Sequence, residues 1–423
     1  MIRTIRYTSP EDLSFLKRTD NTDVTAIVRD IIRDVQDNGD SALYAYSRKF
    51  DHAELSALEV TQAEIDAAFD TVDSQFISIL REAKANIEAF HRHQIENGFT
   101  VHDKNGVILG QRVLPLEKVG LYVPGGTAAY PSSVLMNCVP AVLAGCGEIV
   151  MVTPPSADGS VNPVILAAAK VAGVGRIFKV GGAQAVAALA YGTESIPKVD
   201  KIVGPGNRFV AEAKKQVFGA VDIDMIAGPS EILIVADGTC NPRFVAADLL
   251  SQAEHDKLAS AVLLTDSEAL ADSVAKELEI QIPQLLRSEI AGYSIEHYGA
   301  IIQVDSIEQA IEVSNRIAPE HLELCMDKPF DYLNLVQNAG SVFLGKNCPE
   351  PLGDYFAGPN HTLPTSGTAR FSSPLSVYDF VKRMQFTYFT PDALCAVKDK
   401  VAYFATQEGL TAHAKSATIR FEQ

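Results

Sequence analysis

The run Val119-Gly-Leu-Tyr-Val-Pro-Gly-Gly126 sets the pattern that decides the fold of this chain. Its first five residues have the composition of a buried strand, a glycine turn ends that strand, and a helical run follows the turn. The same order of strand, turn and helix returns at residues 148–155, 176–182 and 201–206, and a strand at residues 231–236 closes the set. Strands that alternate with helices in this way are joined by βαβ crossovers, so we predict a parallel, doubly wound α/β sheet.

A second alternating series follows the first. Its strands are expected at residues 259–265, 298–304, 322–326 and 341–343, and its helices at residues 267–278 and before Pro319. Two helical stretches, at about residues 24–35 and 62–93, come before both series. The tail from about residue 376 is predicted to be helical and to belong to neither sheet. The pattern therefore predicts two α/β units with helical segments at both ends.

Composition and charge exclude two classes of partner. The chain has 423 residues, is 47% hydrophobic and carries a formal net charge of −17 without any basic run. A chain of this size can bury a large core, and its charge argues against binding to nucleic acid or to an anionic membrane. The long apolar stretch at residues 134–152 contains Pro140 and Glu148, so we interpret it as buried core and not as a membrane span.

The cysteines and the N-terminus indicate a compartment. The N-terminal residues lack the apolar segment of a secretory signal. The six cysteines are widely spread and form no Cys-x-x-Cys pair. We therefore expect reduced thiols and a cytoplasmic protein.

The doublet Glu320-His321 is the strongest candidate for catalysis. The helix before it is expected to begin at Asp305 or Ser306, and Pro319 disfavours a helical conformation at the residue that precedes it. The doublet should therefore lie in a turn, just before a half-buried strand. A carboxylate beside an imidazole at such a junction suits a general base and a neighbouring acid–base group. The alternative is a solvated loop with a surface ion pair.

Gln252 and His255 are candidates for metal ligands. They lie three residues apart near the end of a helical run, so both side chains project from one face of that helix. An ordinary helix surface is the alternative, because glutamine is an uncommon zinc ligand. Asp354 and His361 lie in a loop rich in glycine and proline, and His413 lies near the C-terminus. The sequence alone does not show that these residues converge.

The glycine turns at residues 124–126, 181–182 and 204–206 are candidates for a nucleotide site. Ligands of open α/β sheets bind at the carboxyl ends of the strands, where such turns let the backbone approach closely. None of the three is a dinucleotide fingerprint, because Gly204-Pro-Gly206-Asn-Arg-Phe209 lacks the third glycine. Glycine turns are also needed simply to join strands to helices, so the pattern leaves both interpretations open.

Taken together, these segments closely resemble the histidinol dehydrogenase family over nearly the whole chain. Each matching segment is short, but their joint occurrence in this order is highly specific. The segments are Gly120-Leu-Tyr-Val-Pro-Gly-Gly126, Val180-Gly-Gly-Ala-Gln184, Val203-Gly-Pro-Gly-Asn207, Ala227-Gly-Pro-Ser-Glu231, Ser251-Gln-Ala-Glu-His-Asp256, Ala318-Pro-Glu-His321, Gly353-Asp354, Gly358-Pro-Asn-His361 and Glu408-Gly-Leu-Thr-Ala-His413. No position that the family uses for chemistry is substituted.

The resemblance implies a fold and an assembly. The family has two incomplete Rossmann-like domains, with the second inserted into the first. Here the first domain would comprise residues 23–120 and 232–375, and the second residues 121–231, with extensions at residues 1–22 and 376–423. The resemblance also implies an intertwined homodimer with shared active sites, in which the C-terminal extension serves dimerisation.

The resemblance further implies an activity. Members of the family oxidise L-histidinol through L-histidinal to L-histidine, the last steps of histidine biosynthesis, with NAD and one zinc ion per subunit. The positions that match zinc ligands are Gln252, His255, Asp354 and His413, with His413 supplied by the partner subunit. The further positions that match contacts to the substrate are Ser230, His321, His361 and Glu408. The positions that match the surroundings of the cofactor are Tyr122, Gln184 and Asn207.

In this interpretation one doublet serves both oxidations. His321 takes the proton of the hydroxyl group, and Glu320 activates the water that attacks the aldehyde. One alternative is a relative within the family that oxidises another small polar alcohol, such as a sulfonated diol. The presence of Glu408 and His413, which hold an amino-imidazole substrate in the family, argues against it. The other alternative is a catalytically silent protein that binds a nucleotide or a metal, and the intact doublet counts against it.

Overall fold

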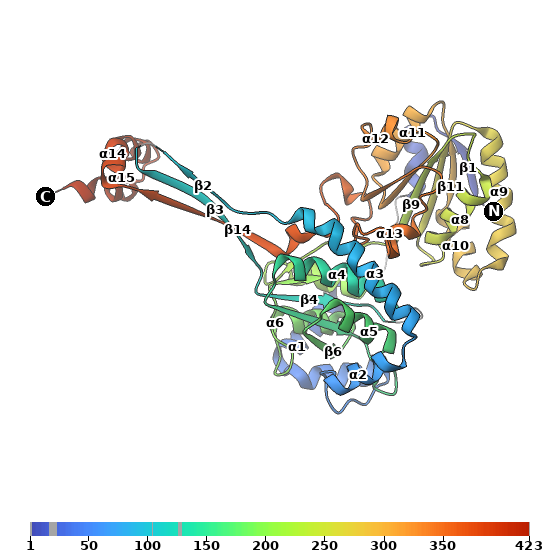
Figure 1. Cartoon of the computed structure of the whole chain (residues 1–423), viewed down its shortest axis with the longest axis horizontal. Helices are drawn as coiled ribbons and strands as arrows, with labels where there is room; N and C mark the ends of the chain where they lie inside the picture. Colours follow the sequence, from blue (N-terminus) through green and yellow to red (C-terminus); the bar gives the residue numbers. More distant parts are fainter. Residues whose placement is uncertain (1, 17–22, 104, 126–128, 423) are drawn as a thin grey trace. The chain divides into compact units, whose positions relative to one another are not determined.

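The computed structural model describes residues 2–16, 23–103, 105–125 and 129–422, and the chain divides into two units (Figure 1). Unit 1 comprises Met1–Gln94 and Leu116–Phe380, and unit 2 comprises Ile95–Pro115 and Val381–Gln423. Unit 1 contains a sheet of five strands and a sheet of six. Among the described residues, no helix combines the length and the apolar character needed to cross a membrane.

The five-stranded sheet is fully parallel and has the strand order β6-β5-β4-β7-β8. Its strands are β4 (Lys118–Tyr122), β5 (Glu148–Thr153), β6 (Arg176–Lys179), β7 (Lys201–Val203) and β8 (Asp222–Ile223). The helices between them are α4 (Pro131–Ala144), α5 (Pro163–Ala172), α6 (Gly182–Tyr191) and α7 (Arg208–Val217). The chain builds outward from β4 to β6 and then returns to place β7 on the other side of β4, so the strand order reverses between β4 and β7. The predicted doubly wound sheet is confirmed.

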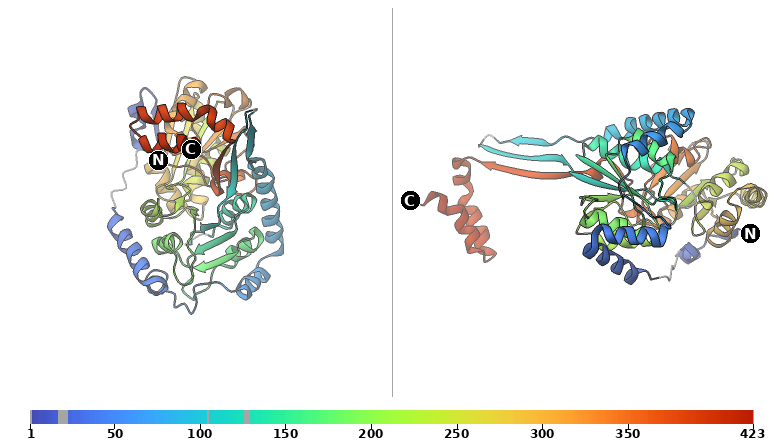
Figure 2. Two further views of the ribbon diagram at one scale, coloured as in Figure 1. Left: turned by 90° about the vertical axis from the view of Figure 1, so that its left-hand side faces the viewer. Right: turned by 90° about the horizontal axis from the view of Figure 1, so that it is seen from below.

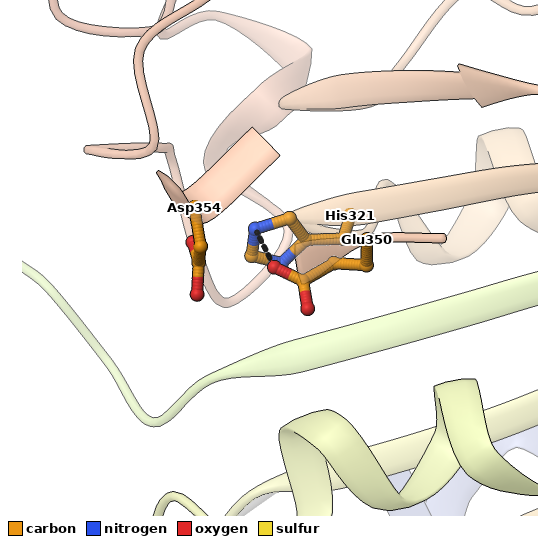
Figure 3. A group of neighbouring side chains, drawn as sticks. All are labelled: His321, Glu350 and Asp354. Carbon is orange, nitrogen blue, oxygen red and sulfur yellow. Dashed lines mark ion pairs between the residues drawn. The ribbon is translucent and has the colours of Figure 1, made fainter. Parts of the chain in front are cut away.

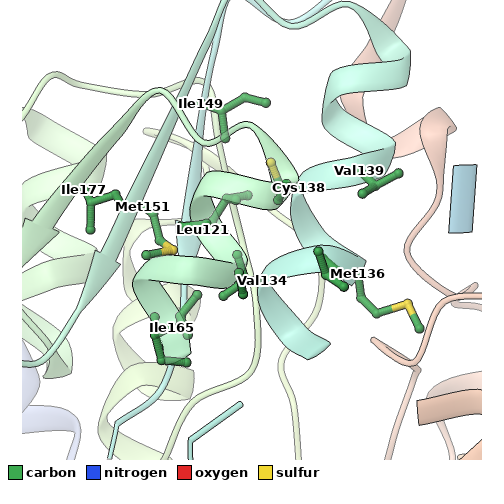
Figure 4. Packing of buried hydrophobic residues seen from close by; sticks show 14 of the residues in the cluster. Leu121, Val134, Met136, Cys138, Val139, Ile149, Met151, Ile165 and Ile177 are labelled. Carbon is green, nitrogen blue, oxygen red and sulfur yellow. The ribbon is translucent and has the colours of Figure 1, made fainter. Parts of the chain in front are cut away.

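Each face of this sheet has its own apolar core, because alternate residues of a strand point to opposite faces. One core joins Leu121 and Met151 to residues of α4 and α5, as Figure 4 shows. The other core joins Val150 and Phe178 to residues of α6 and α7. The apolar stretch at residues 134–152 thus forms most of a buried helix and a buried strand, as predicted.

The N-terminal helices pack on this same sheet. They are α1 (Thr25–Tyr46), α2 (Gln62–Thr71) and α3 (Ser74–His91). Helix α1 contributes Val28 to one core, and α3 contributes Leu80 and Ile87 to the other. This packing differs from the expected grouping of residues 23–120 with residues 232–375. The apolar stripe of α1 predicts that the helix covers a sheet, but it does not predict which sheet.

The predicted helical stretch at residues 62–93 is two helices. Thr61 and Glu64 form a capping box at the start of α2, in which each side chain accepts a hydrogen bond from the other residue's backbone N–H. Asp73 caps α3 by accepting a hydrogen bond from the N–H of Gln75. Thr61 and Asp73 therefore mark two helix starts where the sequence predicted one helical stretch.

The six-stranded sheet is also parallel, with the order β1-β11-β10-β9-β12-β13. Its strands are β1 (Arg3–Arg6), β9 (Glu231–Ala236), β10 (Ser260–Thr265), β11 (Ala300–Gln303), β12 (His321–Cys325) and β13 (Ser341–Leu344). The associated helices are α8 (Pro242–Ala253), α9 (Glu268–Gln281), α10 (Ser288–Tyr298), α11 (Ile307–Ile317), α12 (Phe330–Leu333) and α13 (Pro351–Tyr355). Residues 3–6, expected in a separate extension, add an edge strand to this sheet. Residues 1 and 17–22 of that extension lie outside the described residues.

Unit 2 is a three-stranded antiparallel sheet with two helices; Figure 2 gives two further views of the ribbon. Its strands are β2 (Phe99–His102), β3 (Val107–Pro115) and β14 (Val381–Phe389), in the order β14-β3-β2, and its helices are α14 (Pro391–Gln407) and α15 (Thr411–Thr418). The prediction that the tail is wholly helical is therefore wrong at β14. Residues 383–388 alternate polar and apolar side chains, which is a strand pattern, so the sequence did carry a signal for β14 although most of its residues are exposed.

Candidate functional site

Glu320 and His321 lie at the junction of α11 and β12. The hydroxyl of Ser306 caps α11 by accepting a hydrogen bond from the N–H of Gln309, and α11 ends at Ile317. Ala318 then adopts a left-handed conformation with φ 55°, which turns the chain before Pro319. Glu320 lies in this bend, and His321 is the first residue of β12. The turn predicted for the doublet is thus confirmed for Glu320 but not for His321.

Both side chains of the doublet are buried, so the interpretation as a solvated loop is wrong. Glu320 is 8% exposed and His321 is 4% exposed. The Nδ1 atom of His321 lies 3.0 Å from the backbone carbonyl of Glu231, so Nδ1 carries the hydrogen because a carbonyl only accepts. The Oε2 atom of Glu320 accepts the backbone N–H of Glu231 at 2.8 Å and lies 3.6 Å from His321 Nδ1. The pairing of β9 with β12 therefore fixes the ring tautomer of His321.

Glu350 faces the other ring nitrogen of His321, and sequence reasoning missed it. Its Oε1 atom lies 3.4 Å from His321 Nε2, and its side chain is buried (Figure 3). The hydroxyl of Ser251 donates to its Oε2 atom at 3.2 Å, and its own N–H donates to Glu323. One signal could have found it: Glu350 precedes Asp354 by four residues, the spacing of neighbours on one helix face.

Asp354 and His361, both predicted, meet in the structure. The Oδ1 atom of Asp354, on α13, lies 3.3 Å from His361 Nδ1. The other ring nitrogen of His361 lies 3.3 Å from the hydroxyl of Ser133 on α4. The neighbouring residues are held as well, since the side chain of Asn360 donates to Met136 O at 2.7 Å. The loop rich in glycine and proline is therefore tied to α4 and holds His361 in place.

Gln252 and His255 lie at the end of α8, near the same carboxylate. Gln252 is in the last turn of α8, is buried, and has an Nε2 atom without a hydrogen-bond partner among the described residues. His255 follows the helix, and a positive charge on its ring would lower the pKa of both Asp354 and His321. Asp354 therefore has His255, His321 and His361 as electrostatic neighbours, and the interpretation of Gln252 as an ordinary surface residue is wrong.

The pKa values in this cluster diverge. Burial lowers the pKa of His321 to about 4 despite the neighbouring carboxylate of Asp354. Burial, and then the charge of Asp354, raises the pKa of Glu350 to about 8. Burial alone would also raise the pKa of Asp354, but hydrogen bonding to His361 and the nearby histidines lower it to about 2. At neutral pH, His321 is therefore a neutral imidazole beside an ionised Asp354.

The same cluster can hold a metal ion. One ligand atom each from His321, Glu350 and Asp354 lie within 4.8 Å of one another. Together with the predicted ligands Gln252 and His255, these residues offer nitrogen and oxygen donors, a set that suits zinc. Of the four predicted ligands, the structure places Asp354 in this group, beside Glu350 and His321. His255 is an electrostatic neighbour of Asp354, and binding of zinc by Gln252, His255 and His413 stays a prediction.

The remaining residues predicted to contact the substrate lie in two places. Ser230 precedes β9, at the same amino edge of the six-stranded sheet as Glu320. Glu408 and His413 belong to unit 2, where Glu408 follows α14 and His413 lies on α15. Both side chains are exposed. Their approach to the cluster around Asp354 stays a prediction.

Residues predicted near the cofactor surround the carboxyl edge of the five-stranded sheet. Tyr122 ends β4, and its buried hydroxyl accepts the N–H of Gly182 at 3.0 Å. Gln184 is buried in the first turn of α6. Asn207 caps α7, where its Oδ1 atom accepts the N–H groups of Phe209 and Val210. All three lie at or after the carboxyl ends of strands, the edge where ligands of such sheets bind. Gly126 of the first glycine turn lies outside the described residues.

Several known proteins that resemble this chain are described as histidinol dehydrogenases. The model of the family "Histidinol dehydrogenase" matches residues 16–421. A histidinol dehydrogenase of Clostridium acetobutylicum is 58% identical over 403 residues, which cover 95% of this chain and 94% of that protein. One of Lactococcus lactis subsp. lactis is 55% identical, with coverage of 95% and 94%. The crystal structure of histidinol dehydrogenase from Elizabethkingia anophelis matches with a TM-score of 0.94 at 41% identity, covering 99% of this chain and 98% of that one.

Proposed function

Because this chain belongs to the histidinol dehydrogenase family, we propose that it oxidises L-histidinol through L-histidinal to L-histidine, the last steps of histidine biosynthesis, with zinc and NAD. The observation that carries the proposal is a buried, neutral imidazole with a fixed tautomer, His321, beside an ionised carboxylate, Asp354. A general base must be unprotonated and held in place, and His321 meets both conditions.

Zinc is proposed because the donor set fits it. Asp354 is ionised, His255 offers an imidazole, and the buried side chain of Gln252 offers an amide oxygen. These three residues and the partner subunit's His413 would hold the ion. When bound, zinc would anchor the imidazole and amino groups of the substrate. Ser230, His361 and Glu408 would complete the contacts to the substrate.

NAD is proposed at the carboxyl edge of the five-stranded sheet. The strand order reverses there between β4 and β7, and Tyr122, Gln184 and Asn207 surround this point. Helix α6 begins at Gly182 after a glycine that offers no side-chain cap, which leaves room for an anionic group at the helix start. When bound, NAD accepts the hydride that each oxidation removes.

In the first oxidation His321 acts as the base. Its Nδ1–H is bound to the carbonyl of Glu231, so the lone pair that takes the hydroxyl proton is on Nε2, the nitrogen that faces Glu350 Oε1 at 3.4 Å. The imidazolium that forms is stabilised by the negative charge of Asp354. Burial opposes this charge and keeps the ring neutral until the proton moves.

In the second oxidation Glu320 activates the water that attacks the aldehyde. Burial raises the pKa of Glu320 well above its ordinary value, which makes its ionised form a stronger base than a surface carboxylate. The hydrate that results again carries a hydroxyl proton, and His321 takes it after the proton from the first oxidation has passed to solvent.

Glu320→Gln should separate the two half-reactions. Glutamine retains an oxygen that can accept the N–H of Glu231, but it cannot activate water. We expect oxidation of histidinal to fall by roughly 10²–10⁴-fold and oxidation of histidinol to fall much less, with each substrate measured separately. Glu312→Gln, on the exposed face of α11, removes the same charge and should leave both rates unchanged. Equal losses in the two steps of Glu320→Gln would refute the assigned role.

A cytoplasmic homodimer is part of the proposal. All six cysteines are free thiols, which suits a reducing compartment. Unit 2 exposes large apolar side chains on its strands, a surface that in a stable protein is covered by a partner. These side chains are Phe99, Val101, Leu109, Met384 and Tyr388. A second copy of this chain would bury them and bring His413 to the partner's site.

A further inference from the structure

Lys214 and Asp224 form an ion pair inside the five-stranded sheet region, away from the catalytic cluster. Lys214 lies on α7, and Asp224 follows β8. The two side chains are in contact, and they are only 2% and 1% exposed. Burying two charges costs several kcal/mol per ion unless further hydrogen bonds satisfy them. The other hydrogen bonds of Lys214 and Asp224 therefore indicate which part of the structure the ion pair supports.

Both charged groups bind the backbone of Gly204. The N–H of Gly204 donates to Asp224 Oδ2 at 2.7 Å, and the ammonium group of Lys214 donates to the carbonyl of Gly204 at 3.0 Å. Gly204 has φ 113°, and a Cβ atom there would lie 2.1 Å from the carbonyl oxygen of Tyr122. The backbone N–H and the carbonyl of Gly204 are thus both hydrogen-bonded to charged side chains, and the position has no room for a side chain.

Gly204 occupies the point where the proposed cofactor would bind. It follows β7 directly, β7 pairs with β4, and the strand order of the sheet reverses between these two strands. The turn that begins at Gly204 ends at Asn207, the cap of α7. A shift of Gly204 would therefore move Asn207 and the start of α7 together.

We propose that Lys214 and Asp224 are positioning residues for the dinucleotide, acting through the turn at residues 204–207. This inference rests on the proposed use of NAD at this edge. A turn that only joins a strand to a helix needs hydrogen bonds but no buried charges, whereas a turn that must match a ligand gains from a rigid support. Neither residue touches the reacting atoms, so the pair should govern the affinity for the cofactor and not the chemical steps.

Lys201 provides a matched control at the opposite end of the same strand. It begins β7 at its amino end, is buried, and forms ion pairs with Asp222 at 3.0 Å and Asp379 at 3.3 Å. Lys201→Met removes a buried ammonium group from β7 and destabilises the same sheet, but it leaves the turn at residues 204–207 untouched. A general loss of stability would therefore appear in this variant too.

The test compares steady-state kinetics and NADH binding in four proteins: wild type, Lys214→Met, Lys201→Met, and the double variant Lys214→Met with Asp224→Leu. The double variant leaves no unpaired buried charge, so it decides the outcome if the single variant fails to fold. We expect the KM for NAD and the Kd for NADH to rise roughly 10- to 100-fold in the Lys214 variants. The KM for histidinol, kcat at saturating NAD and zinc content should change less than about threefold in all of them.

Two results would overturn the inference: an unchanged KM for NAD in a folded Lys214 variant, or an equal rise in Lys201→Met. The failure of the proposed function is a different result, because wild-type protein would then form no NADH from histidinol.

Discussion

Replacing His321 by asparagine lowers the rate of histidinol oxidation by roughly 10²–10⁴-fold, because the protein loses the base that takes the hydroxyl proton. The amide of asparagine can still donate to the carbonyl of Glu231, so β12 should keep its pairing with β9. Because the proposed zinc ligands do not include His321, we expect unchanged zinc content, and we expect a cooperative unfolding transition close to that of the wild type. Turnover is measured as NADH absorbance at saturating histidinol and NAD.

A surface histidine gives the control for this prediction. His297, on α10, is exposed and stacks on Tyr293, so His297→Asn removes an imidazole from the same unit without touching the cluster. Its turnover should equal that of the wild type. Wild-type turnover in His321→Asn would remove His321 from the mechanism.

The variants His413→Ala and His255→Ala should each be nearly inactive alone and should each lose zinc, since each removes a proposed ligand. If His413 completes the site of the partner subunit, a mixed dimer has one site with both defects and one with neither. Random pairing gives about half mixed dimers, each with one intact site of two, so activity should return to roughly a quarter of wild type after co-refolding. Zinc content should recover in the same proportion.

The matched control for this experiment pairs two defects that lie in the same unit. His255→Ala mixed with His321→Asn leaves one defect in each site of every mixed dimer, because both residues belong to unit 1. This mixture should show no recovery. If the His413 and His255 variants form proven heterodimers and also show no recovery, His413 acts within its own chain.

The alternation of strands, turns and helices predicts both parallel sheets, because strands such as β5 and β10 are buried on both faces and read as apolar runs. An apolar run does not mark β14, whose residues are largely exposed, or the short β1 at the edge of a sheet. It also fails to assign α1 to a sheet. An apolar helix face requires a partner surface, and the identity of that surface depends on contacts between residues far apart in sequence.

The sequence predicted those site residues whose side chains are typical of acid–base catalysis or of metal binding. Glu320, His321, Asp354 and His361 lie in one cluster, in which His321 contacts Glu320 and Asp354 contacts His361, with side chains from the start of β12, α13 and the loop after it. Glu350 was missed because it lies between two prolines, where no regular helix is expected, and α13 has only five residues. The tautomer of His321 could not be predicted from the sequence. It depends on the carbonyl of Glu231, which lies beside the ring only because of the register in which β9 and β12 pair.

The number of NADH molecules formed per histidinol consumed tests the central claim most directly. A site with one base and one water-activating carboxylate carries the alcohol to the acid, so the account predicts about two NADH for each histidinol and histidine as the product. Purified protein loaded with zinc, limiting histidinol and excess NAD are sufficient for the measurement. One NADH per histidinol with histidinal released, or no NADH at all, would contradict the account.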